Sequence, residues 1–464
     1  MAVAAGQSHT VVAGQDGCVF SFGFNYAGQL GVGDNGTRLA PARLTGLTEP
    51  VRQVAAGQGH TGIVTDAGDL LMCGCGRGGR LGLGDKEDQA TPTQVARAAF
   101  DGEAVLMVAC GMEHTVVATE GGGVYTFGSG IYGRLGHGDE EDQLVPRRVP
   151  AAGFNCEQVV MVAAGGVHTV ALSEAGHVFT WGSGEVGQLG HDDREELWAP
   201  RQVEAGRFGG EQVVFVAAGK SYTVAVTAGG RLYTWGLGAR GQLGHGDTGS
   251  RLVPTLVGGP TGPAFGAPEG GRVVMAACGG RHTLVVTQDG GLWACGSGYQ
   301  GRLGLNDEAD RPAFERLGGT TGAAFGGARV VAAAVGYMHS VAVTEDGALW
   351  TWGAGFDGRL GRGNEEHCLV PTRVPVASLQ NTRIGRCRPL PRGHAVALAM
   401  GTHSRLGAAS PVRVLGGEVG LLTMIARFSG AWIAGVAGRS EGLVRLLGGV
   451  TANPAHRYQL ETVG

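Results

Sequence analysis

The chain has 464 residues, of which 43% are apolar and 89 are glycine, and its net charge is −4. This length and apolar content allow a large buried core, and the net charge argues against a general nucleic-acid binder, which needs a basic excess. Glycine is more than twice as frequent as in an average protein, which predicts disorder if the glycines are aperiodic and a repeat protein if they are periodic. Charged residues make up only 16% of the chain, so we expect it to fold.

The cysteines and the apolar stretches bear on the cell compartment. Nine cysteines without a C-x-x-C pair predict reduced thiols in an intracellular protein. The N-terminal sequence MAVAAGQSHT lacks the charged and apolar regions of a signal peptide. The longest apolar stretch is interrupted by Arg427, which argues against a membrane span. We therefore expect a cytoplasmic protein, with the nucleus as the alternative, and no membrane contact.

An anchor sequence, A-A-G-x-x-H-T in its commonest form, occurs seven times along the chain. The anchor position is Tyr222 in the fifth copy and a histidine in the other six, namely His9, His60, His114, His168, His282 and His339. The interval between successive anchor positions is nearly constant: it is identical for the three steps from His60 to Tyr222 and longest for the step from Tyr222 to His282. This spacing predicts a repeat architecture with about fifty residues in each unit.

A glycine motif follows each anchor, as in YTWGLGARGQLGHGD at residues 233–247. Six of the seven copies contain G-x-G-x-x-G, the fingerprint of a dinucleotide-binding turn. A dinucleotide site needs one such turn at the start of a helix, whereas six copies that open no helix indicate a structural role. The motif ends at the same interval after every anchor position, and in six units a proline follows at a second constant interval, as Asp85 and Pro92 follow His60. We predict no cofactor.

Each unit is predicted to consist of short strands. In the fourth unit, the apolar run Val159–Gly165 is followed by His168–Ser173 and then by His177–Gly182, which is rich in aromatic and β-branched residues. Strand-only units of this length are typical of β-propeller blades. Length varies mainly at Gly258–Gly271 and Gly318–Gly327, whose composition predicts flexible surface loops.

The order of anchor, glycine motif and proline over residues 1–376 resembles the regulator of chromosome condensation family of seven-bladed β-propellers. The resemblance implies either guanine-nucleotide exchange on a small GTPase or protein–protein scaffolding. The family's plant ultraviolet-B photoreceptor has tryptophan in G-W-R-H-T motifs, where this chain has Gly280, so we expect no light sensing. Exchange in the family is attributed to one propeller face and a wedge-like insertion in an early blade, and the third and fourth units have no insertion. We therefore expect a non-enzymatic interaction scaffold, with an exchange factor as the alternative.

The repeated histidines allow two interpretations, a metal site or a structural role. One histidine in each blade lies too far from its neighbours to share a metal at Zn–N distances of about 2.0 Å, so a structural histidine that bonds the backbone between strands is favoured. The same interpretation extends to His137, His191 and His245, which follow the Leu-Gly pair within the glycine motif. The sequence has no H-E-x-x-H, no Walker lysine and no evident nucleophile–base pair. We predict no catalytic and no metal-binding residue.

Acidic residues recur just after the glycine motifs, and equivalent positions in a closed propeller lie on one side. This acidic rim is either a solvated surface or a docking face for a basic partner. We expect protein partners, a small GTPase among the candidates, and no direct nucleic-acid binding. The acidic rim consists of Glu87, Asp88, Asp139, Glu140, Glu141, Asp142, Asp193, Glu195, Glu196, Asp307, Glu308, Glu365 and Glu366.

Residues 377–464 depart from the repeat and carry ten arginines against three glutamates. His394 follows His339 at the spacing of the repeat, which predicts a partial eighth repeat over 377–407 that adds a strand to the first blade and closes the ring. The remaining residues, 408–464, form a basic extension with two predicted short amphipathic helices. The expected domains are therefore 1–376, 377–407 and 408–464.

Overall fold

The computed structural model describes residues 2–14, 17–258, 265–266, 271–318 and 323–375. Internal contacts divide the chain into two units, Met1–Leu390 and Pro391–Gly464. The second unit lies outside the described residues, and so do the predicted partial repeat at 377–407 and the two predicted helices. These expectations stay predictions.

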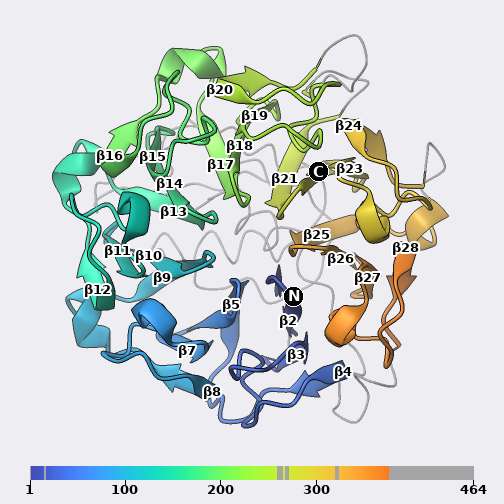
Figure 1. Cartoon of the computed structure of the whole chain (residues 1–464), viewed down its shortest axis with the longest axis horizontal. Coiled ribbons are helices and arrows are strands. Elements are labelled where there is room, and N and C mark those ends of the chain that lie inside the picture. The colour runs from blue at the N-terminus through green and yellow to red at the C-terminus, as the bar shows by residue number, and fades with distance from the viewer. Residues whose placement is uncertain (1, 15–16, 259–264, 267–270, 319–322, 376–464) are drawn as a thin grey trace, which may run out of the picture. The chain divides into compact units, whose positions relative to one another are not determined.

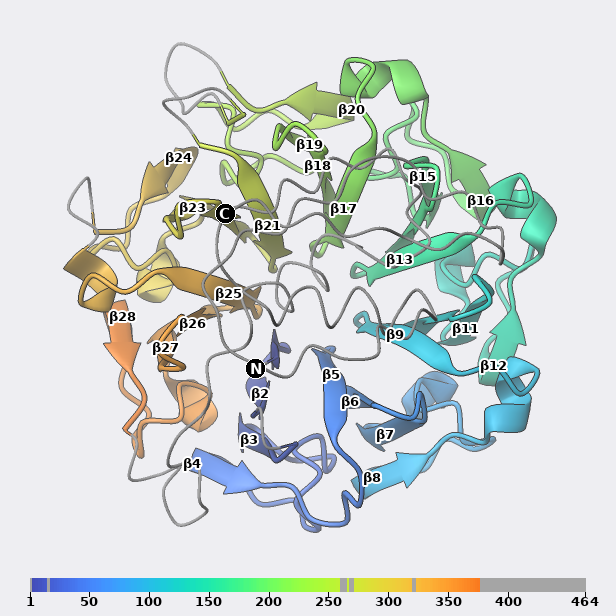
Figure 2. The ribbon, with the colours of Figure 1, turned by 180° about the vertical axis from the view of Figure 1, so that it is seen from behind.

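Seven four-stranded antiparallel sheets are arranged as blades around a common centre (Figure 1). Each blade is made of four consecutive strands, from β1–β4 in the first blade to β25–β28 in the seventh. The view from behind shows the same order of blades (Figure 2). The predicted seven-bladed propeller is confirmed.

The four strand positions of the blades have the following bounds. The innermost strands are β1 (Ala2–Ala5), β5 (Val51–Ala56), β9 (Val105–Cys110), β13 (Val159–Ala164), β17 (Val213–Ala218), β21 (Val273–Cys278) and β25 (Val330–Val335). The second strands are β2 (His9–Ala13), β6 (His60–Thr65), β10 (His114–Thr119), β14 (His168–Ser173), β18 (Tyr222–Thr227), β22 (His282–Thr287) and β26 (His339–Thr344). The third strands are β3 (Val19–Gly23), β7 (Leu70–Gly74), β11 (Val124–Gly128), β15 (Val178–Gly182), β19 (Leu232–Gly236), β23 (Leu292–Gly296) and β27 (Leu349–Gly353). The outermost strands are β4 (Arg38–Arg43), β8 (Gln89–Gln94), β12 (Gln143–Arg148), β16 (Leu197–Gln202), β20 (Arg251–Leu256), β24 (Arg311–Arg316) and β28 (Cys368–Arg373).

The repeated prolines lie in the outermost strands, as Pro146 does in β12. Proline lacks the amide hydrogen that a central strand needs, so an edge position is where a sheet tolerates it. The anchor position begins the second strand of every blade and is fully buried there.

Aromatic side chains pack where one blade leads into the next. Phe154 in the connection to the fourth blade contacts Phe179 and Trp181 of β15, with ring centroids 5.5 and 5.8 Å apart. Four further phenylalanines pack edge-on against aromatic residues in the same way, namely Phe100, Phe208, Phe265 and Phe325. Edge-to-face packing of this kind adds to the stabilisation from burial alone.

The two long connections differ from their predicted character at these phenylalanines. Composition predicted flexible surface loops at 258–271 and 318–327, yet Phe265 is 3% exposed and Phe325 is 5% exposed. Phe325 is the end of a short 3-10 helix, η8 (Ala323–Phe325), and contacts Trp350 and Trp352. Each connection therefore contains a buried core residue that its glycine-rich composition did not indicate.

The first and seventh blades contact each other directly through their described strands. β1 and β2 belong to the first blade's own sheet, and β1 contacts β25 and β26 of the seventh blade. Residues 2–43 fill all four strand positions of the first blade. An additional strand from 377–407 falls outside the described residues.

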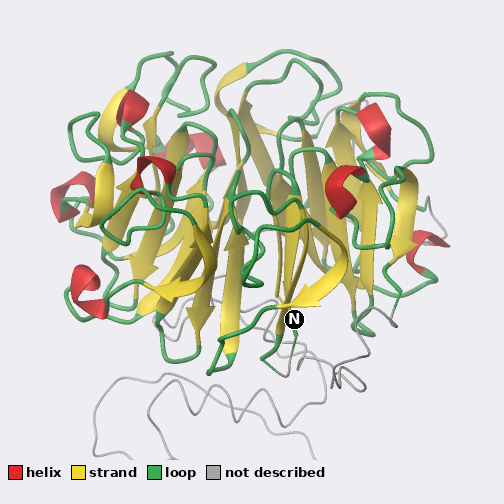
Figure 3. Ribbon diagram, turned by 60° about the horizontal axis from the view of Figure 1, so that its bottom comes forward, coloured by secondary structure: helices red, strands yellow, loops and turns green. Residues whose placement is uncertain are grey.

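Each blade has loops at two faces because its strands alternate in direction (Figure 3). The turns between the first and second strands and the glycine motifs between the third and fourth strands emerge on the same side. We call this side the glycine-loop face. In four blades the glycine motif includes a three-residue 3-10 helix, namely η1 (Arg77–Gly79), η3 (Ile131–Gly133), η6 (Tyr299–Gly301) and η9 (Phe356–Gly358). A single 3-10 turn provides no helix of the kind that binds a dinucleotide phosphate.

The opposite face has the connections between blades. Its 3-10 helices are η2 (Arg97–Phe100), η4 (Ala151–Phe154), η5 (Ala205–Phe208) and η8. In the part of the chain that is described, no helix is long and apolar enough to cross a membrane.

Candidate functional site

A hydrogen bond from each anchor side chain to the next blade lies beneath the glycine-loop face. His60 Nε2 lies 3.0 Å from Thr115 Oγ1, and His339 Nε2 of the seventh blade lies 2.9 Å from Thr10 Oγ1 of the first. We call each such contact an interblade rung. The other histidine rungs join His9 to Thr61, His114 to Thr169, His168 to Thr223 and His282 to Ser340.

The hydroxyl partners determine how the histidines are protonated. Thr115 Oγ1 donates its hydrogen to the carbonyl oxygen of Arg80 at 2.7 Å, so only its lone pairs face His60. His60 Nε2 must therefore carry the hydrogen and donate it. Each rung thus leads from the anchor of one blade to a hydroxyl of the next and back to a carbonyl of the first. The predicted bond between strands exists, but a side chain accepts it and not the backbone.

Burial makes these histidines poor bases. Desolvation lowers the pKa of His9 to about 4 and that of His168 to about 3. The pKa values of the other four anchor histidines are likewise lowered, first by burial. The anchors are therefore neutral near pH 7, with Nε2 as donor. His137, His191 and His245 each contact a threonine hydroxyl of their own blade, and burial lowers their pKa values as well.

Tyr222 replaces histidine in the fifth blade and also reaches the sixth. Its hydroxyl donates to the carbonyl oxygen of His282 at 2.6 Å, accepts from the amide of Gly279 at 3.1 Å and lies 3.0 Å from Thr283 Oγ1. Burial raises the pKa of this phenol well above its usual value. The rung between these blades thus depends on a hydroxyl group that stays uncharged over the pH range in which proteins are usually studied.

The glycines of the anchor sequences allow the backbones of neighbouring blades to approach each other closely. A Cβ atom on Gly57 would lie 2.4 Å from the carbonyl oxygen of Gly111 in the next blade and 2.5 Å from Cε1 of His60. In the glycine motif, Gly79 has a φ of 82°, and its Cβ would lie 2.7 Å from Cα of Leu144 in the next blade. The predicted structural role of the repeated glycines is therefore close backbone contact between neighbouring blades.

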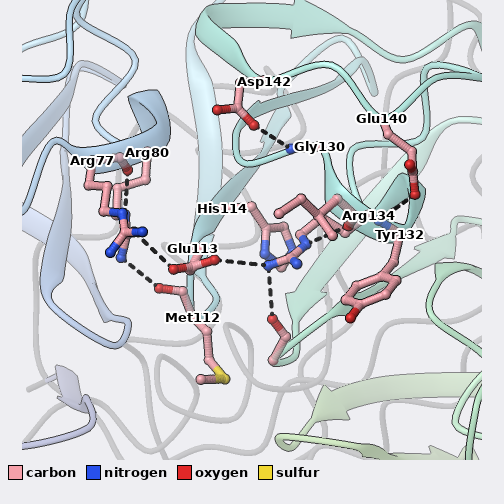
Figure 4. A network of polar contacts seen from close by, with 12 residues as sticks. Arg77, Arg80, Met112, Glu113, His114, Gly130, Tyr132, Arg134, Glu140 and Asp142 are labelled. Atoms are coloured by element: carbon pink, nitrogen blue, oxygen red, sulfur yellow. Dashed lines mark hydrogen bonds and ion pairs between the residues drawn. The ribbon is translucent and has the colours of Figure 1, made fainter.

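A network of charged groups connects the second and third blades on the glycine-loop face (Figure 4). Glu113, just before the anchor of the third blade, lies 3.5 Å from Arg80 and 3.8 Å from Arg134. Both arginines come from glycine motifs, and their side chains are 4% and 3% exposed. Arg80 Nη1 also donates to the carbonyl oxygen of Met112 at 2.9 Å. One carboxylate therefore neutralises two buried guanidinium groups.

Apolar side chains project from the glycine motifs of four blades on this face. Tyr26 is 78% exposed and Tyr299 is 52% exposed. Phe24, Ile131, Tyr132 and Phe356 are also exposed there. Exposed apolar side chains that gather on one face can form a contact surface for another protein.

The innermost turns of all seven blades surround a small cavity at the centre of the glycine-loop face. Its volume is about 100 Å³, and the anchor glycines, Lys220 and Tyr337 are among its lining residues. Sites that bury a drug-sized ligand or a nucleotide are typically three to ten times larger.

The acidic rim lies at the loops that follow the glycine motifs, and many of its carboxylates are already engaged. Asp139, Asp193 and Asp307 form ion pairs with arginines of the adjoining outermost strands, at distances from 2.6 to 3.5 Å. Asp88 and Asp142 accept backbone amides of their own glycine motifs, and Glu140 and Glu365 accept backbone amides as well.

Asp142 also lies 3.7 Å from Lys86, whereas the remaining rim carboxylates are more open to solvent. Glu366 contacts Asn364. Glu87, Glu141, Glu195, Glu196 and Glu308 are exposed and make no ion pair within the described ranges. The docking role of the rim stays a prediction.

Across the described segments, no group of three histidine, cysteine, aspartate or glutamate side chains is placed to hold a metal ion. The eight cysteines of the described residues are free thiols. Sequence reasoning missed the Glu113 network and the row of packed phenylalanines. A phenylalanine shortly before the innermost strand recurs at one and the same interval at Phe100, Phe154, Phe208 and Phe325, so this signal was available.

Comparisons with known proteins give the family. The RCC1-like domain matches residues 146–406, and the regulator of chromosome condensation (RCC1) repeat matches residues 16–64 and 67–118. The ultraviolet-B receptor UVR8 of Arabidopsis thaliana is 38% identical over 313 residues, which cover 67% of this chain and 68% of that protein. The human E3 ubiquitin-protein ligase HERC2 is 33% identical over 384 residues, 81% of this chain but only 8% of that protein.

A solved structure agrees with these matches. Prp20p of Saccharomyces cerevisiae, the yeast RCC1, superposes with a TM-score of 0.65 at 25% identity and covers 80% of this chain and 86% of that one. The anchors, the glycine motifs, the seven blades and the matched residue ranges lead to the same assignment. The chain belongs to the regulator of chromosome condensation (RCC1) family.

Proposed function

We propose that this propeller is a non-enzymatic protein–protein interaction scaffold that receives its partner on the glycine-loop face. The observation that carries the proposal is the set of exposed apolar side chains from four different blades, with Tyr26 and Tyr299 the most exposed of the aromatic ones. Aromatic side chains are enriched at the centres of protein interfaces, where they bury a large area at a small cost in conformational entropy.

The interblade rungs support this proposal because they make the face rigid. Seven blades are joined by buried hydrogen bonds, and the loops that present the aromatic residues begin directly at the strands of those blades. A preorganised surface loses little conformational entropy when it binds, so more of its contact energy appears as affinity.

Guanine-nucleotide exchange on a small GTPase is the alternative function. It is supported by the likeness to Prp20p, whose structure is reported together with its binding to Gsp1p and histones. An exchange factor must contact the nucleotide-free GTPase differently from the loaded one. The third and fourth blades, which are fully described, have glycine motifs of uniform length and no insertion that would provide such a contact.

Two measurements on the full chain test these functions. The triple variant Tyr26→Ala, Tyr299→Ala, Phe356→Ala should capture at least about tenfold less partner protein than wild type does from an extract of the source cell. Quantitative mass spectrometry measures the captured amounts. Leu256→Ala, at an exposed position of the outermost strand of the fifth blade, is the matched control and should capture as wild type does. Equal capture by wild type and the triple variant would overturn the proposed face.

The second measurement separates scaffold from exchange factor. Micromolar propeller should leave the release of labelled GDP from Ran-type and other small GTPases unchanged. A many-fold acceleration by a catalytic amount of the protein would replace the scaffold function with exchange.

A further inference from the structure

The third and sixth blades place a buried arginine at the same position of the glycine motif. Arg134 Nε donates to the carbonyl oxygen of Ile131 at 2.8 Å, and Arg302 Nε donates to that of Tyr299 at 2.9 Å. Each guanidinium also reaches a carbonyl of the following blade and lies near a tyrosine ring, with 5.8 Å to the Tyr132 centroid and 5.6 Å to the Tyr299 centroid. Both side chains are 3% exposed. The two sites are structural equivalents.

They differ in the residue just before the anchor of the same blade. The third blade has Glu113 there, whose carboxylate neutralises Arg134. The sixth blade has Arg281 at the same position, exposed and without an ion pair among the described residues. Arg302 likewise has no carboxylate within 4 Å in the described part of the chain. Arg302 thus lacks the carboxylate that Glu113 supplies to Arg134.

Neighbouring residues increase the positive charge at this site. Lys220 of the fifth blade is exposed, and its Nζ lies 5.6 Å from the ring centroid of Tyr337 in the seventh blade. Asp310 influences Arg302 electrostatically, but its carboxylate is engaged with Arg240 at 3.3 Å and with the amide of Gly298 at 3.0 Å. Burial and, next, the charge of Arg281 lower the pKa of Arg302. A buried guanidinium beside a like charge is costly unless an anion compensates it.

We propose that Arg281, Arg302 and Lys220 form a binding site for a carboxylate side chain of an acidic segment of a partner protein. This inference rests on the proposed function, because it assigns partner chemistry to the glycine-loop face. The partner's carboxylate takes the role that Glu113 has within the third blade. Arginine favours carboxylates because its planar group can donate two parallel hydrogen bonds, and partial burial strengthens these bonds.

The surroundings of the site fit a peptide segment better than an isolated anion. The exposed ring of Tyr299 borders it on one side and the half-buried ring of Tyr337 on another, so residues that flank the acidic side chain find apolar contact. The chain's own residues 377–464 are a poor occupant, since ten arginines against three glutamates give them the wrong charge. A separate acidic protein segment is the occupant that the charge complementarity favours.

The test measures binding of two fluorescent peptides to the full-length protein by anisotropy. One peptide has about twelve residues of alternating Glu and Ser, and the other has Gln in place of every Glu. At about 50 mM salt, where screening is weak, the Glu peptide should bind at least about tenfold more tightly than the Gln peptide. Its affinity should fall steeply towards about 1 M salt. Equal affinity for both peptides would overturn the proposal.

Charge-changing variants locate the site. Arg281→Glu reproduces the arrangement of the third blade. This variant should bind the Glu peptide at least about tenfold more weakly than wild type does. Arg43→Glu changes the net charge by the same amount at an exposed position of β4 and should bind as wild type does. Equal loss in both variants would show attraction by the overall charge and overturn the proposal. Arg281→Gln provides the same readout without charge reversal if Arg281→Glu folds poorly.

The peptide-binding experiment and the partner-capture experiment test separate claims, so one can contradict its claim while the other supports its own. If the peptides do not discriminate while capture still depends on Tyr26, Tyr299 and Phe356, this inference is wrong and the proposed function stands. If capture is also independent of those residues, the proposed face itself is wrong.

Discussion

The fifth blade and the six histidine-anchored blades achieve the same connection with different chemistry. His168 reaches the next blade through one Nε2 bond, and its Nδ1 has no hydrogen-bond partner among the described residues. Tyr222 extends further and places its hydroxyl among the carbonyl of His282, the amide of Gly279 and the hydroxyl of Thr283. Both side chains are fully buried above an anchor glycine.

This difference shows what the repeat requires at the anchor position. The position requires a flat, neutral side chain that donates one hydrogen bond across the blade boundary. It does not require the imidazole ring of histidine. A metal or proton-transfer role would not survive replacement by a phenol with a raised pKa. The comparison therefore favours a structural role for the anchors, and the following variants test it in order of expected effect.

The largest effect is expected when a rung is removed. His168→Ala should lower the free energy of unfolding by about 3 kcal/mol, because a cavity forms in the core and the Thr223 hydroxyl loses its donor. Tyr222→Phe deletes only a hydroxyl and should cost about 1–2 kcal/mol. Urea denaturation at pH 8 measures both. A loss for Tyr222→Phe as large as that for His168→Ala would mean that the fifth blade depends more on its polar contacts than on ring packing.

The next prediction concerns pH, because only the histidine rungs can be protonated. The folded-state pKa of His9 is about 4, below the value of about 6.5 expected in the unfolded chain. Between these values the unfolded chain binds more protons, so the stability present above pH 6.5 is lost as the pH falls towards 4. Tyr222→His should steepen this loss by up to about 1.4 kcal/mol for each unit of pKa shift that the new histidine acquires.

Melting curves of wild type and Tyr222→His from pH 8 to pH 4 provide the measurement. The two proteins should be similar in stability at pH 8 and diverge below pH 6.5. Parallel curves over the whole range would mean that a histidine at this position stays accessible to solvent, contrary to the burial of Tyr222.

Much of this architecture could be predicted from the sequence because the repeat constrains it seven times over. The constant interval from anchor to glycine motif fixed the order of strands in each blade, as β14 and β15 show. The single strands of the fourth unit were placed within one residue of their observed bounds. Periodicity identifies what all blades share, and the shared features determine the fold.

The candidate site depends instead on what differs between blades. Glu113 and Arg281 occupy the same repeat position with opposite charge, and an interpretation based on the repeat treats both as variable. Their importance follows from the buried arginines beside them. These arginines are distant in the sequence, so their proximity becomes visible only in the structure. The same holds for the acidic rim, whose residues looked equivalent in the sequence but divide into engaged and unengaged carboxylates.

A third, smaller effect is expected in the Glu113 network, which the fifth blade lacks. There, Ser221 precedes the anchor, and Gln242 takes the place of Arg134 and accepts the amide of Arg240. Glu113→Gln should cost about 1–3 kcal/mol because Arg80 and Arg134 lose their shared carboxylate. Glu141→Gln, at an exposed position without an ion pair, is the control and should change thermal stability little. Equal melting temperatures for both variants would mean that solvent compensates the two arginines.

The smallest effect on stability is expected at the acidic rim, which is interrupted at the fifth blade. The loop after its glycine motif, residues 248–250, has no glutamate, whereas the third and fourth blades present Glu141 and Glu195 there. Reversal of Asp139 or Asp142 would break loop contacts, so Glu87, Glu141 and Glu195 are the residues to change to lysine. Unfolding free energy should stay within about 0.5 kcal/mol of wild type, since these side chains are exposed and make no ion pair.

Association with a partner decides what the acidic rim does. If a basic partner docks there, the triple lysine variant should associate more slowly at low salt, and the difference should shrink at about 1 M salt, where the screening length falls to about 3 Å. Thr248→Lys in the fifth blade adds positive charge where the rim has a gap and should slow association less. If both variants associate at the wild-type rate, the rim does not steer the partner, and the apolar residues of the glycine-loop face bind it without long-range attraction.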